Sequence, residues 1–206
     1  MYKRQLGEAL AKLHRAGADF PGQRANALSV GGWRPLYEVV RARCDALQPG
    51  LSALLAAELG LLESRWPRDL SQGVIHADHF PANVFFLGDK LSGLIDFYFA
   101  CTDALAYDLA ICLNAWCFEA DHSYNVTKGK ALLSAYAAVR PLSPAERQAL
   151  PMLARGSALR FLLTRLVDWF DERGATLVRR KDPMEYFRKL RFHQAVASVR
   201  DYGIDE

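Results

Sequence analysis

The sequence has no hydrophobic run long enough to cross a membrane. Its longest stretch without a charged residue, Ala46 to Ala57, has 12 residues, whereas a membrane-spanning helix needs ~20. The first residues show neither the layout of a signal peptide nor the Arg- and Ser-rich composition of a transit segment. We therefore expect a cytoplasmic protein that has no membrane partner.

The chain also has few cysteines and a small net charge. The chain has four cysteines among 206 residues, and none of them forms a C-x-x-C pair or stands at zinc-finger spacing. This usage argues against a disulfide framework and predicts a reducing compartment. Lys and Arg number 26 against 23 Asp and Glu, so the net charge is +3. Such a small charge does not indicate a nucleic-acid partner.

The composition that is present is typical of a globular protein with a sizeable core. Hydrophobic residues make up 51% of the chain and charged residues 24%, which excludes disorder or a coiled coil as a description of the whole chain. The length fits one domain. We expect residues 1–206 to form a single α+β domain that is mainly α-helical.

Apolar spacing predicts helices towards both ends of the chain and short strands in its middle. Glycines and prolines predict a loop over residues 17–35, and Pro49-Gly50 and Pro67 separate the next helices. The predicted helices cover about 6–13, 36–47, 51–66, 105–118 and the whole chain from 128 onward, where a long helix is expected over 155–170 and capping patterns stand at 143–146 and 182–185. The predicted strands are 74–75, 83–87 and 91–95, around a turn at 88–90.

The polar residues of this β element form a pattern that phosphoryl transfer needs. His76, Asp78 and Asn83 lie in one short loop, and Asp96 ends the strand run that follows. One carboxylate could accept the proton of an attacking hydroxyl, while hard oxygen ligands could hold Mg²⁺ on the phosphates of ATP. The spacing matches the H-R-D-x-x-x-x-N loop of protein kinases, with Ala77 in the Arg position. Turn-forming Asp and Asn residues and an exposed strand end would produce the same pattern.

These residues stand in segments that resemble the aminoglycoside-phosphotransferase and choline-kinase-like family, which shares the protein-kinase fold. Within that family the segments are most similar to the homoserine kinases, and the block from 73 to 117 is the most specific. The resemblance implies the α-rich C-terminal lobe of a kinase-like phosphotransferase, in which a small β hairpin carries the catalytic loop. The resembling segments are Gln5 to His14, Gly73 to Asn83, Gly93 to Ala100, Ala104 to Trp116 and Arg155 to Phe161.

The resemblance also implies a role for each polar residue of the central block. Asp78 would be the catalytic base, and Asn83 and Asp96 would bind Mg²⁺. His76 would brace the loop. Asp108 would be a buried support that accepts hydrogen bonds from the loop, because a buried carboxylate needs such partners. A simple N-cap ahead of the following helix is the alternative for Asp108.

The chain departs from the family pattern in two ways. His79 and Ala82 replace an apolar residue and an Asp or Gly of many members, and we expect both to line the chemistry. The sequence also has no Gly-x-Gly-x-x-Gly, no Walker loop and no Val-Ala-Ile-Lys-like strand, so the resemblance covers the C-terminal lobe without its nucleotide-binding N-terminal lobe. We expect this chain alone to be inactive.

The N-terminal helix is poorly capped, since Lys3 and Arg4 lie where acidic residues are preferred. A helix that has lost the chain before it would look like this. A frayed natural terminus is the alternative.

The activity implied for the parent enzyme is ATP-dependent phosphorylation of a small-molecule hydroxyl. The resemblance favours L-homoserine as the acceptor, giving O-phospho-L-homoserine in threonine biosynthesis. A kinase of an amino alcohol or an aminoglycoside is the alternative enzyme, and a non-catalytic fragment or binding module is the competing class. No feature of the sequence predicts an oligomeric state.

The carboxylate of homoserine would be held best by an arginine fork, which pairs bidentately and stays charged. Arg160 is the candidate because it lies in a resembling segment, and Asn114 and Trp116 are candidate wall residues on the helix after Asp108. The alternative is that Arg160 pairs with an acid on a neighbouring helix.

Overall fold

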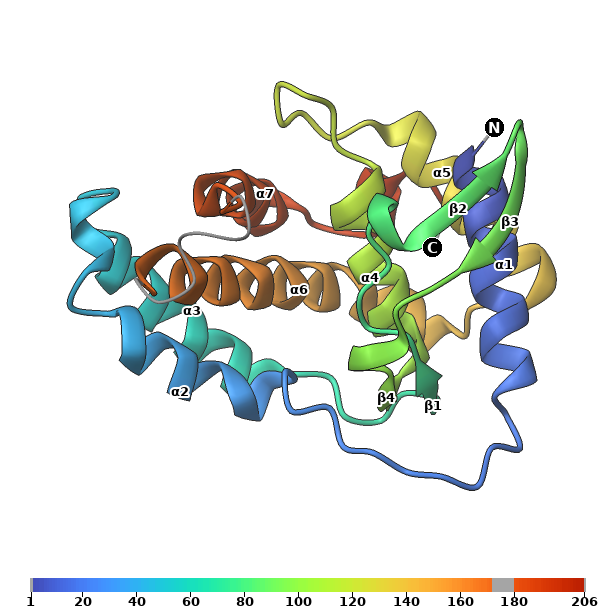
Figure 1. The fold of residues 1–206 in the computed structure, drawn as a ribbon, viewed down its shortest axis with the longest axis horizontal. Coiled ribbons are helices and arrows are strands. Elements are labelled where there is room, and N and C mark those ends of the chain that lie inside the picture. The colour runs from blue at the N-terminus through green and yellow to red at the C-terminus, as the bar shows by residue number, and fades with distance from the viewer. Residues whose placement is uncertain (1, 172–179, 206) are drawn as a thin grey trace.

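A computed structural model describes residues 2–171 and 180–205. The long helix α6 (Pro144–Phe170) runs through the helical body, with α7 (Pro183–Ala195) packed along one side and α2 (Val30–Val40) and α3 (Leu51–Arg65) on the other (Figure 1). Helix α4 (Leu105–Trp116) crosses one end of α6, and α1 (Tyr2–Ala16) packs on α5 (Val126–Val139) beyond it. The prediction of a mainly helical fold with a small β element is confirmed.

Helix α1 is amphipathic, as its spacing predicts. Leu6, Leu10 and Ala11 are fully buried against the rest of the body, whereas Lys12 pairs with Glu8 on the exposed face. Because the buried stripe docks on α5, this helix forms one wall beside the strands.

The prediction of a loop over residues 17–35 is wrong for its last six residues. Helix α2 begins at Val30, so Gly31, Gly32 and Pro35 are helical. The reason is tertiary: Trp33 is fully buried, its indole N–H donates to the Leu28 carbonyl, and burial of a large aromatic ring outweighs the poor helix propensity of its neighbours. The predicted helix at 36–47 ends at Val40 and is followed by a 3₁₀ turn, η1 (Cys44–Ala46).

The β element consists of two antiparallel pairs. Strands β2 (Val84–Leu87) and β3 (Lys90–Leu94) form the predicted hairpin, with its turn at residues 88–89. Strand β1 (Gln72–Ile75) instead pairs with β4 (Cys101–Ala104), which was not predicted. The sequence Cys-Thr-Asp-Ala lacks both β-branched enrichment and a turn signal, so only its pairing defines it as a strand.

The later helices follow their sequence signals closely. Ser143 and Glu146 form the predicted capping box at the start of α6, and Asp182 accepts the Met184 N–H at the start of α7. The predicted starts at 143 and 155 belong to one helix, because α6 continues through Pro151. Within the described residues, no helix has the length and apolarity needed to cross a lipid bilayer.

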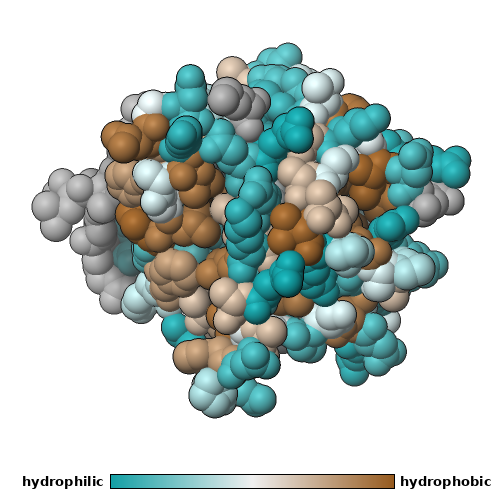
Figure 2. Space-filling model, turned by 90° about the vertical axis from the view of Figure 1, so that its right-hand side faces the viewer, coloured by the Kyte–Doolittle hydropathy of each residue, from teal (hydrophilic) through white to brown (hydrophobic). Residues whose placement is uncertain are grey.

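The surface on the α1 and hairpin side carries brown hydrophobic patches between hydrophilic side chains (Figure 2). Phe85 and Leu87 of β2 belong to the exposed large hydrophobic residues of the molecule, and Leu87 is 80% exposed. The hairpin therefore buries only part of its apolar surface within this chain.

Two helical glycines give a matched test of the packing. A methyl group at Gly156 in α6 would meet the ring of Trp66 and lie 2.7 Å from Cη2 of Trp33, whereas a methyl group at Gly60 in α3 would meet nothing within 4 Å. We expect Gly156→Ala to lower the free energy of unfolding by about 1–3 kcal/mol through overpacking. Gly60→Ala should raise it by about 0.5–1 kcal/mol.

Urea unfolding of both variants beside the unmodified chain measures the two effects. Equal changes for the two variants would contradict the close approach of α6 to the tryptophan pair.

Candidate active site

The loop that carries the predicted catalytic residues runs from β1 to β2 and ends in the 3₁₀ turn η2 (Pro81–Asn83). The loop folds back on itself through Asp78: the Asn83 amide Nδ2 donates to the Asp78 carbonyl at 2.8 Å and to its carboxylate Oδ2 at 3.1 Å. The Phe80 N–H also donates to the Asp78 carbonyl, at 2.8 Å. Asp78 and Asn83 therefore lie side by side at one end of the loop.

Asp108, in the first turn of α4, anchors the other end of the loop. Its two carboxylate oxygens accept the backbone N–H groups of His76 and Ala77, both at 2.8 Å. The side chain is completely buried. The alternative of a helix N-cap is wrong, because Ala104 holds that position and Asp108 lies inside the helix. Ala77 adopts a left-handed backbone with φ of 63°, which is costly for alanine and fits a segment that its contacts hold in place.

Two further histidines surround Asp108. His14 of α1 lies with Nε2 at 3.2 Å from Oδ2 of Asp108 and with Nδ1 at 2.8 Å from the Tyr136 hydroxyl. Burial alone would raise the pKa of Asp108, but His79, His14 and the His76 N–H outweigh it and hold that pKa below the ordinary value. We therefore treat Asp108 as a charged carboxylate at neutral pH. His14 lies in one of the segments that resemble the family, yet its position in the sequence alone predicts only a residue that packs inside a helical body.

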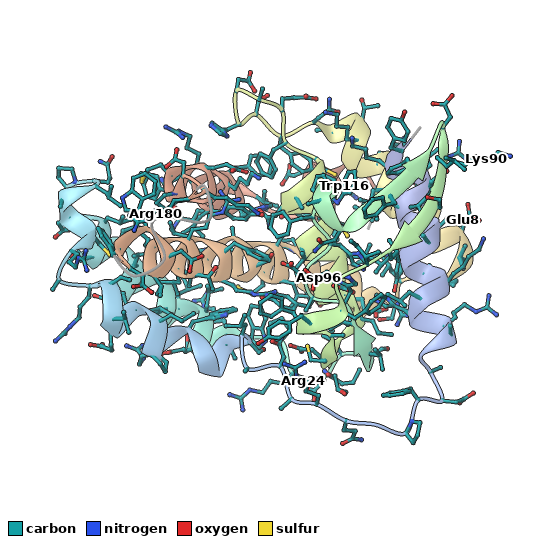
Figure 3. All side chains as sticks on the ribbon, in the orientation of Figure 1. Glu8, Arg24, Lys90, Asp96, Trp116 and Arg180 are labelled. Atoms are coloured by element: carbon teal, nitrogen blue, oxygen red, sulfur yellow. The ribbon has the colours of Figure 1, made fainter. Side chains whose placement is uncertain are left out.

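Ile95 connects Asp96 to the loop through both of its backbone groups. The Ile95 N–H donates to the Asn83 carbonyl at 3.0 Å, and the Ile95 carbonyl lies 2.9 Å from Nε2 of His76. Asp96 follows with a left-handed φ of 63° and accepts the Tyr98 N–H. Its side chain lies near the centre of the view in Figure 3 and is exposed. The hairpin thus attaches the segment that carries Asp96 to the backbone of Asn83.

The environment of Asp78 favours a carboxylate that accepts protons more readily than usual. Burial raises the pKa of Asp78, although the charges of Arg160 and His76 and the hydrogen bond from Asn83 act in the opposite direction. Lys181 adds positive charge nearby, with Nζ 5.0 Å from the centroid of the Phe80 ring. The sequence pattern did not single out Lys181 for this site.

The donor set at this end of the loop suits a hard cation. Because Nδ2 of Asn83 is bound to Asp78, its Oδ1 remains as the oxygen donor, and the exposed Asp96 carboxylate lies on the adjoining segment. Amide and carboxylate oxygens are the ligands that Mg²⁺ prefers. Across the described ranges, no three His, Cys, Asp or Glu side chains are grouped to hold a metal. A magnesium site here would therefore need the amide oxygen of Asn83 as well as the carboxylate of Asp96.

Arg160 and Trp116 contact the loop from the helical body. Arg160 of α6 is 1% exposed and donates from Nη1 to the Ala77 carbonyl at 2.6 Å. Trp116, at the end of α4, donates from its indole to the His79 carbonyl at 2.6 Å. No acid among the described residues lies within ion-pair distance of Arg160. The alternative role, an ion pair with an acid on a neighbouring helix, is found at Arg155 instead, which pairs with Glu58 of α3.

Asn114 does not reach the loop. Its amide Nδ2 donates to the carbonyls of Ala110 and Ala154, and its Oδ1 lies 3.1 Å from Nε2 of His193. The side chain is fully buried between α4, α6 and α7. The prediction that Asn114 lines an acceptor site is wrong, because these interhelical hydrogen bonds use the whole amide.

His79 also lies elsewhere than expected. It was expected to line the chemistry, but its ring is fully buried and stacks on His76 with 4.0 Å between centroids. Neither ring nitrogen makes a hydrogen bond among the described residues, although Nε2 lies 3.7 Å from Oδ2 of Asp108. Burial lowers the pKa of His79 to about 4, against the opposing effect of Asp108. Ala82, the other departure, is exposed on the loop.

Known proteins resemble this chain in sequence over almost its whole length. The model of the phosphotransferase enzyme family (APH) matches residues 2–142. The chain is 67% identical to the homoserine kinase of Rhodopseudomonas palustris over 201 residues, which cover 97% of this chain and 62% of the relative. It is 67% identical to the homoserine kinase of Bradyrhizobium diazoefficiens over 200 residues, covering 97% and 61%. The chain thus spans about three-fifths of the length of these curated relatives.

Solved structures share the fold at much lower sequence identity. A choline/ethanolamine kinase family protein from Mesorhizobium loti matches with a TM-score of 0.67 at 20% identity, over 94% of this chain and 61% of that one. The amicoumacin kinase hAmiN, in complex with AMP-PNP, Ca²⁺ and Ami, matches with a TM-score of 0.61 at 16% identity, over 93% and 58%. These likenesses show a kinase-like phosphotransferase fold.

The buried ring of His79, which makes no hydrogen bond among the described residues, predicts that the stability of the fold is sensitive to acid. The unfolded chain binds this proton near the ordinary pKa of 6.5, whereas the folded chain binds it only near 4, so the free energy of unfolding falls as the pH falls through that window. We expect His79→Leu to reduce this loss. At pH 7 we expect a net change of less than about 1 kcal/mol, because the variant removes buried nitrogens without hydrogen-bond partners but also removes a polar neighbour of the Asp108 carboxylate.

His193→Leu is the matched control for the hydrogen bonds, since His193 is also buried but hydrogen-bonds to Tyr202 and Asn114. Burial lowers the pKa of His193 as well, to about 3, so this variant should also reduce the loss of stability in acid. It should destabilise the fold by about 1–3 kcal/mol at pH 7. Urea unfolding at pH 7 and pH 5 tests both variants. If the free energy of unfolding of His79→Leu depended on pH as strongly as that of the unmodified chain, protonation of this ring would not contribute to the acid sensitivity.

Proposed function

This chain belongs to the phosphotransferase enzyme family, and we propose that it forms the acceptor-binding, catalytic part of an ATP-dependent homoserine kinase. The reaction would convert L-homoserine to O-phospho-L-homoserine, a step of threonine biosynthesis in the cytoplasm. The 67% identity to curated homoserine kinases supports this acceptor. Amino-alcohol and aminoglycoside kinases are less favoured, because their solved structures are 20% identical or less.

One observation carries the proposal within the structure. Ile95 is held on one side by the Asn83 carbonyl and on the other by His76, so the segment of Asp96 is attached to the loop of Asp78 and Asn83. These contacts support a group made of Asp78 and Asn83 from the loop and Asp96 from the segment that follows the hairpin. A phosphotransferase needs such a group, with one base and two ligands.

Asp78 would act as the general base. The homoserine hydroxyl would attack the γ-phosphorus of ATP while its proton passes to the Asp78 carboxylate, and ADP would leave with the electrons of the broken P–O bond. The raised pKa of Asp78 supports this role, because it makes the carboxylate a better proton acceptor than an exposed aspartate. The hydrogen bond from Asn83 would keep its Oδ2 in place.

Asn83 Oδ1 and the Asp96 carboxylate would hold Mg²⁺ together with the phosphates. When bound, Mg²⁺ would neutralise charge on the phosphates and orient them for transfer. His76 and Asp108 would act only through the loop, since their hydrogen bonds go to its backbone and to Ile95.

We further propose that residues 1–206 form a single domain equivalent to the C-terminal lobe of the kinase fold. The sequence carries no glycine-rich loop or lysine strand to grip the phosphates of ATP. In kinase folds those parts belong to the N-terminal lobe and stabilise the charge that develops during transfer. Activity would then require the part of the curated relatives that this chain does not span.

A chimera tests the proposal most simply. We expect the 206-residue chain alone to release almost no ADP with homoserine and MgATP. The same chain joined to the remaining segment of the Rhodopseudomonas palustris relative should turn over at roughly 1 s⁻¹ or more, the usual kinase range. In the chimera, Asp78→Asn should abolish turnover while leaving MgATP binding intact, whereas Asp96→Asn should weaken both.

A coupled ADP-release assay measures turnover, and calorimetry measures nucleotide binding. Asp89→Asn, at the exposed hairpin turn, is a control expected to change neither. Faster turnover of ethanolamine, choline or an aminoglycoside than of homoserine would contradict the proposed acceptor. Loss of MgATP binding in Asp78→Asn but not in Asp96→Asn would reverse the two roles.

A further inference from the structure

A small cavity lies between residues 24–28 and the 3₁₀ turn η3 (Phe97–Phe99), and its connection to the catalytic loop is Arg160, which donates to the Ala77 carbonyl. Its volume is about 230 Å³, enough for a small amino acid, and two arginines line it: Arg24 from the segment after α1 and Arg160 from α6. Asp96 is the residue that precedes this turn, and Arg24 is labelled below it in Figure 3. A larger cavity of about 540 Å³ shares Arg24 and Cys101 with it, but its other lining residues are mainly apolar and it lacks Arg160.

Arg160 is a buried cation without an ion-pair partner among the described residues, although its charge acts on the Asp78 carboxylate from beyond ion-pair distance. It is 1% exposed, and no carboxylate of the described residues lies within ion-pair distance of it. Its Nη1 donates to the Ala77 carbonyl, but its buried Nε has no hydrogen-bond partner among the described residues. Because a buried guanidinium is costly without a compensating anion, this cavity favours a negatively charged ligand.

Arg24 presents a second guanidinium that the fold holds in place. Its backbone lies beside β4, where the Thr102 N–H donates to the Arg24 carbonyl at 2.7 Å and Ala25 forms a parallel bridge with Thr102. Its Nη1 donates to the Tyr98 carbonyl at 2.6 Å. The remaining N–H groups of Arg24 have no hydrogen-bond acceptor in the described part of the chain. They are therefore available to a ligand without a further ordering cost.

The contact of Arg160 with the residue before Asp78 indicates the kind of ligand. Arg160 binds the carbonyl of Ala77, the residue immediately before Asp78. An acceptor with its hydroxyl at Asp78 and a carboxylate at the end of a short aliphatic chain would therefore reach Arg160.

We propose that Arg24 and Arg160 together bind the carboxylate of the acceptor and so select an amino acid over an amino alcohol. The inference rests on the proposed function and adds a residue that neither the sequence pattern nor the catalytic loop identifies. Two arginines give a carboxylate several charge-assisted hydrogen bonds. The same pair would repel choline or ethanolamine, whose only charge is positive.

Ligand-observed NMR titration of the 206-residue chain tests the site without turnover. The probes are L-homoserine, L-2-aminobutyrate, which keeps the carboxylate but lacks the hydroxyl, and L-homoserinol, which keeps the hydroxyl but lacks the carboxylate. We expect the two carboxylates to bind with similar affinity and homoserinol at least about tenfold more weakly. Arg24→Gln should weaken both carboxylates by about tenfold and leave homoserinol unchanged.

Arg24 is the residue to change because its side chain is exposed, whereas Arg160 also supports the loop. Arg41→Gln is the matched control, since Arg41 is an exposed arginine that pairs with Glu38 away from the cavity. Absence of homoserine binding, equal binding of homoserinol, or an unaltered affinity in Arg24→Gln would each overturn the proposal. Carboxylate binding that depends on Arg24, in a chimera that does not phosphorylate homoserine, would support this site and contradict the proposed function.

Discussion

The buried carboxylate of Asp108 is the interaction on which the rest of the site depends. It lies inside the first turn of α4 and accepts the consecutive N–H groups of His76 and Ala77. A buried charge is tolerated only when its oxygens are hydrogen-bonded, and here the donors are the loop backbone and His14. The need to satisfy this carboxylate therefore fixes where the loop leaves β1 and supports the left-handed backbone of Ala77.

From that anchor the geometry extends outward to the reactive side chains. His76, held at its backbone by Asp108, contacts the Ile95 carbonyl with its ring, and Ile95 in turn positions the segment of Asp96. Arg160 of α6 donates to the Ala77 carbonyl, and Asp108 of α4 accepts the Ala77 N–H. Both backbone groups of Ala77 are therefore hydrogen-bonded to the helical body. The loop between β1 and β2 is thus held by defined contacts with the segment after the hairpin, α4 and α6.

Local signals predicted the helices with caps, the β2–β3 hairpin and the loop motif, because each depends on neighbours in sequence. Features set by distant contacts were missed or mistaken. Strand β4 exists through its pairing with β1, and the first turn of α2 forms because Trp33 is buried. Asn114 was mistaken for a wall residue because spacing along α4 does not reveal which neighbouring helix accepts its amide. Arg24 gave no sequence signal because its place beside Arg160 arises only when β4 pairs.

Amide hydrogen exchange of His76 and Ala77, measured by NMR in the unmodified chain and in Asp108→Asn, tests this account most directly. Asparagine keeps the size of the side chain but replaces one acceptor oxygen with a donor. If Asp108 holds the loop, both amides are strongly protected in the unmodified chain. At least one should then exchange about a hundredfold faster in the variant, while amides in the middle of α6 keep their protection. Equal protection of His76 and Ala77 in the two proteins would contradict the central role of Asp108.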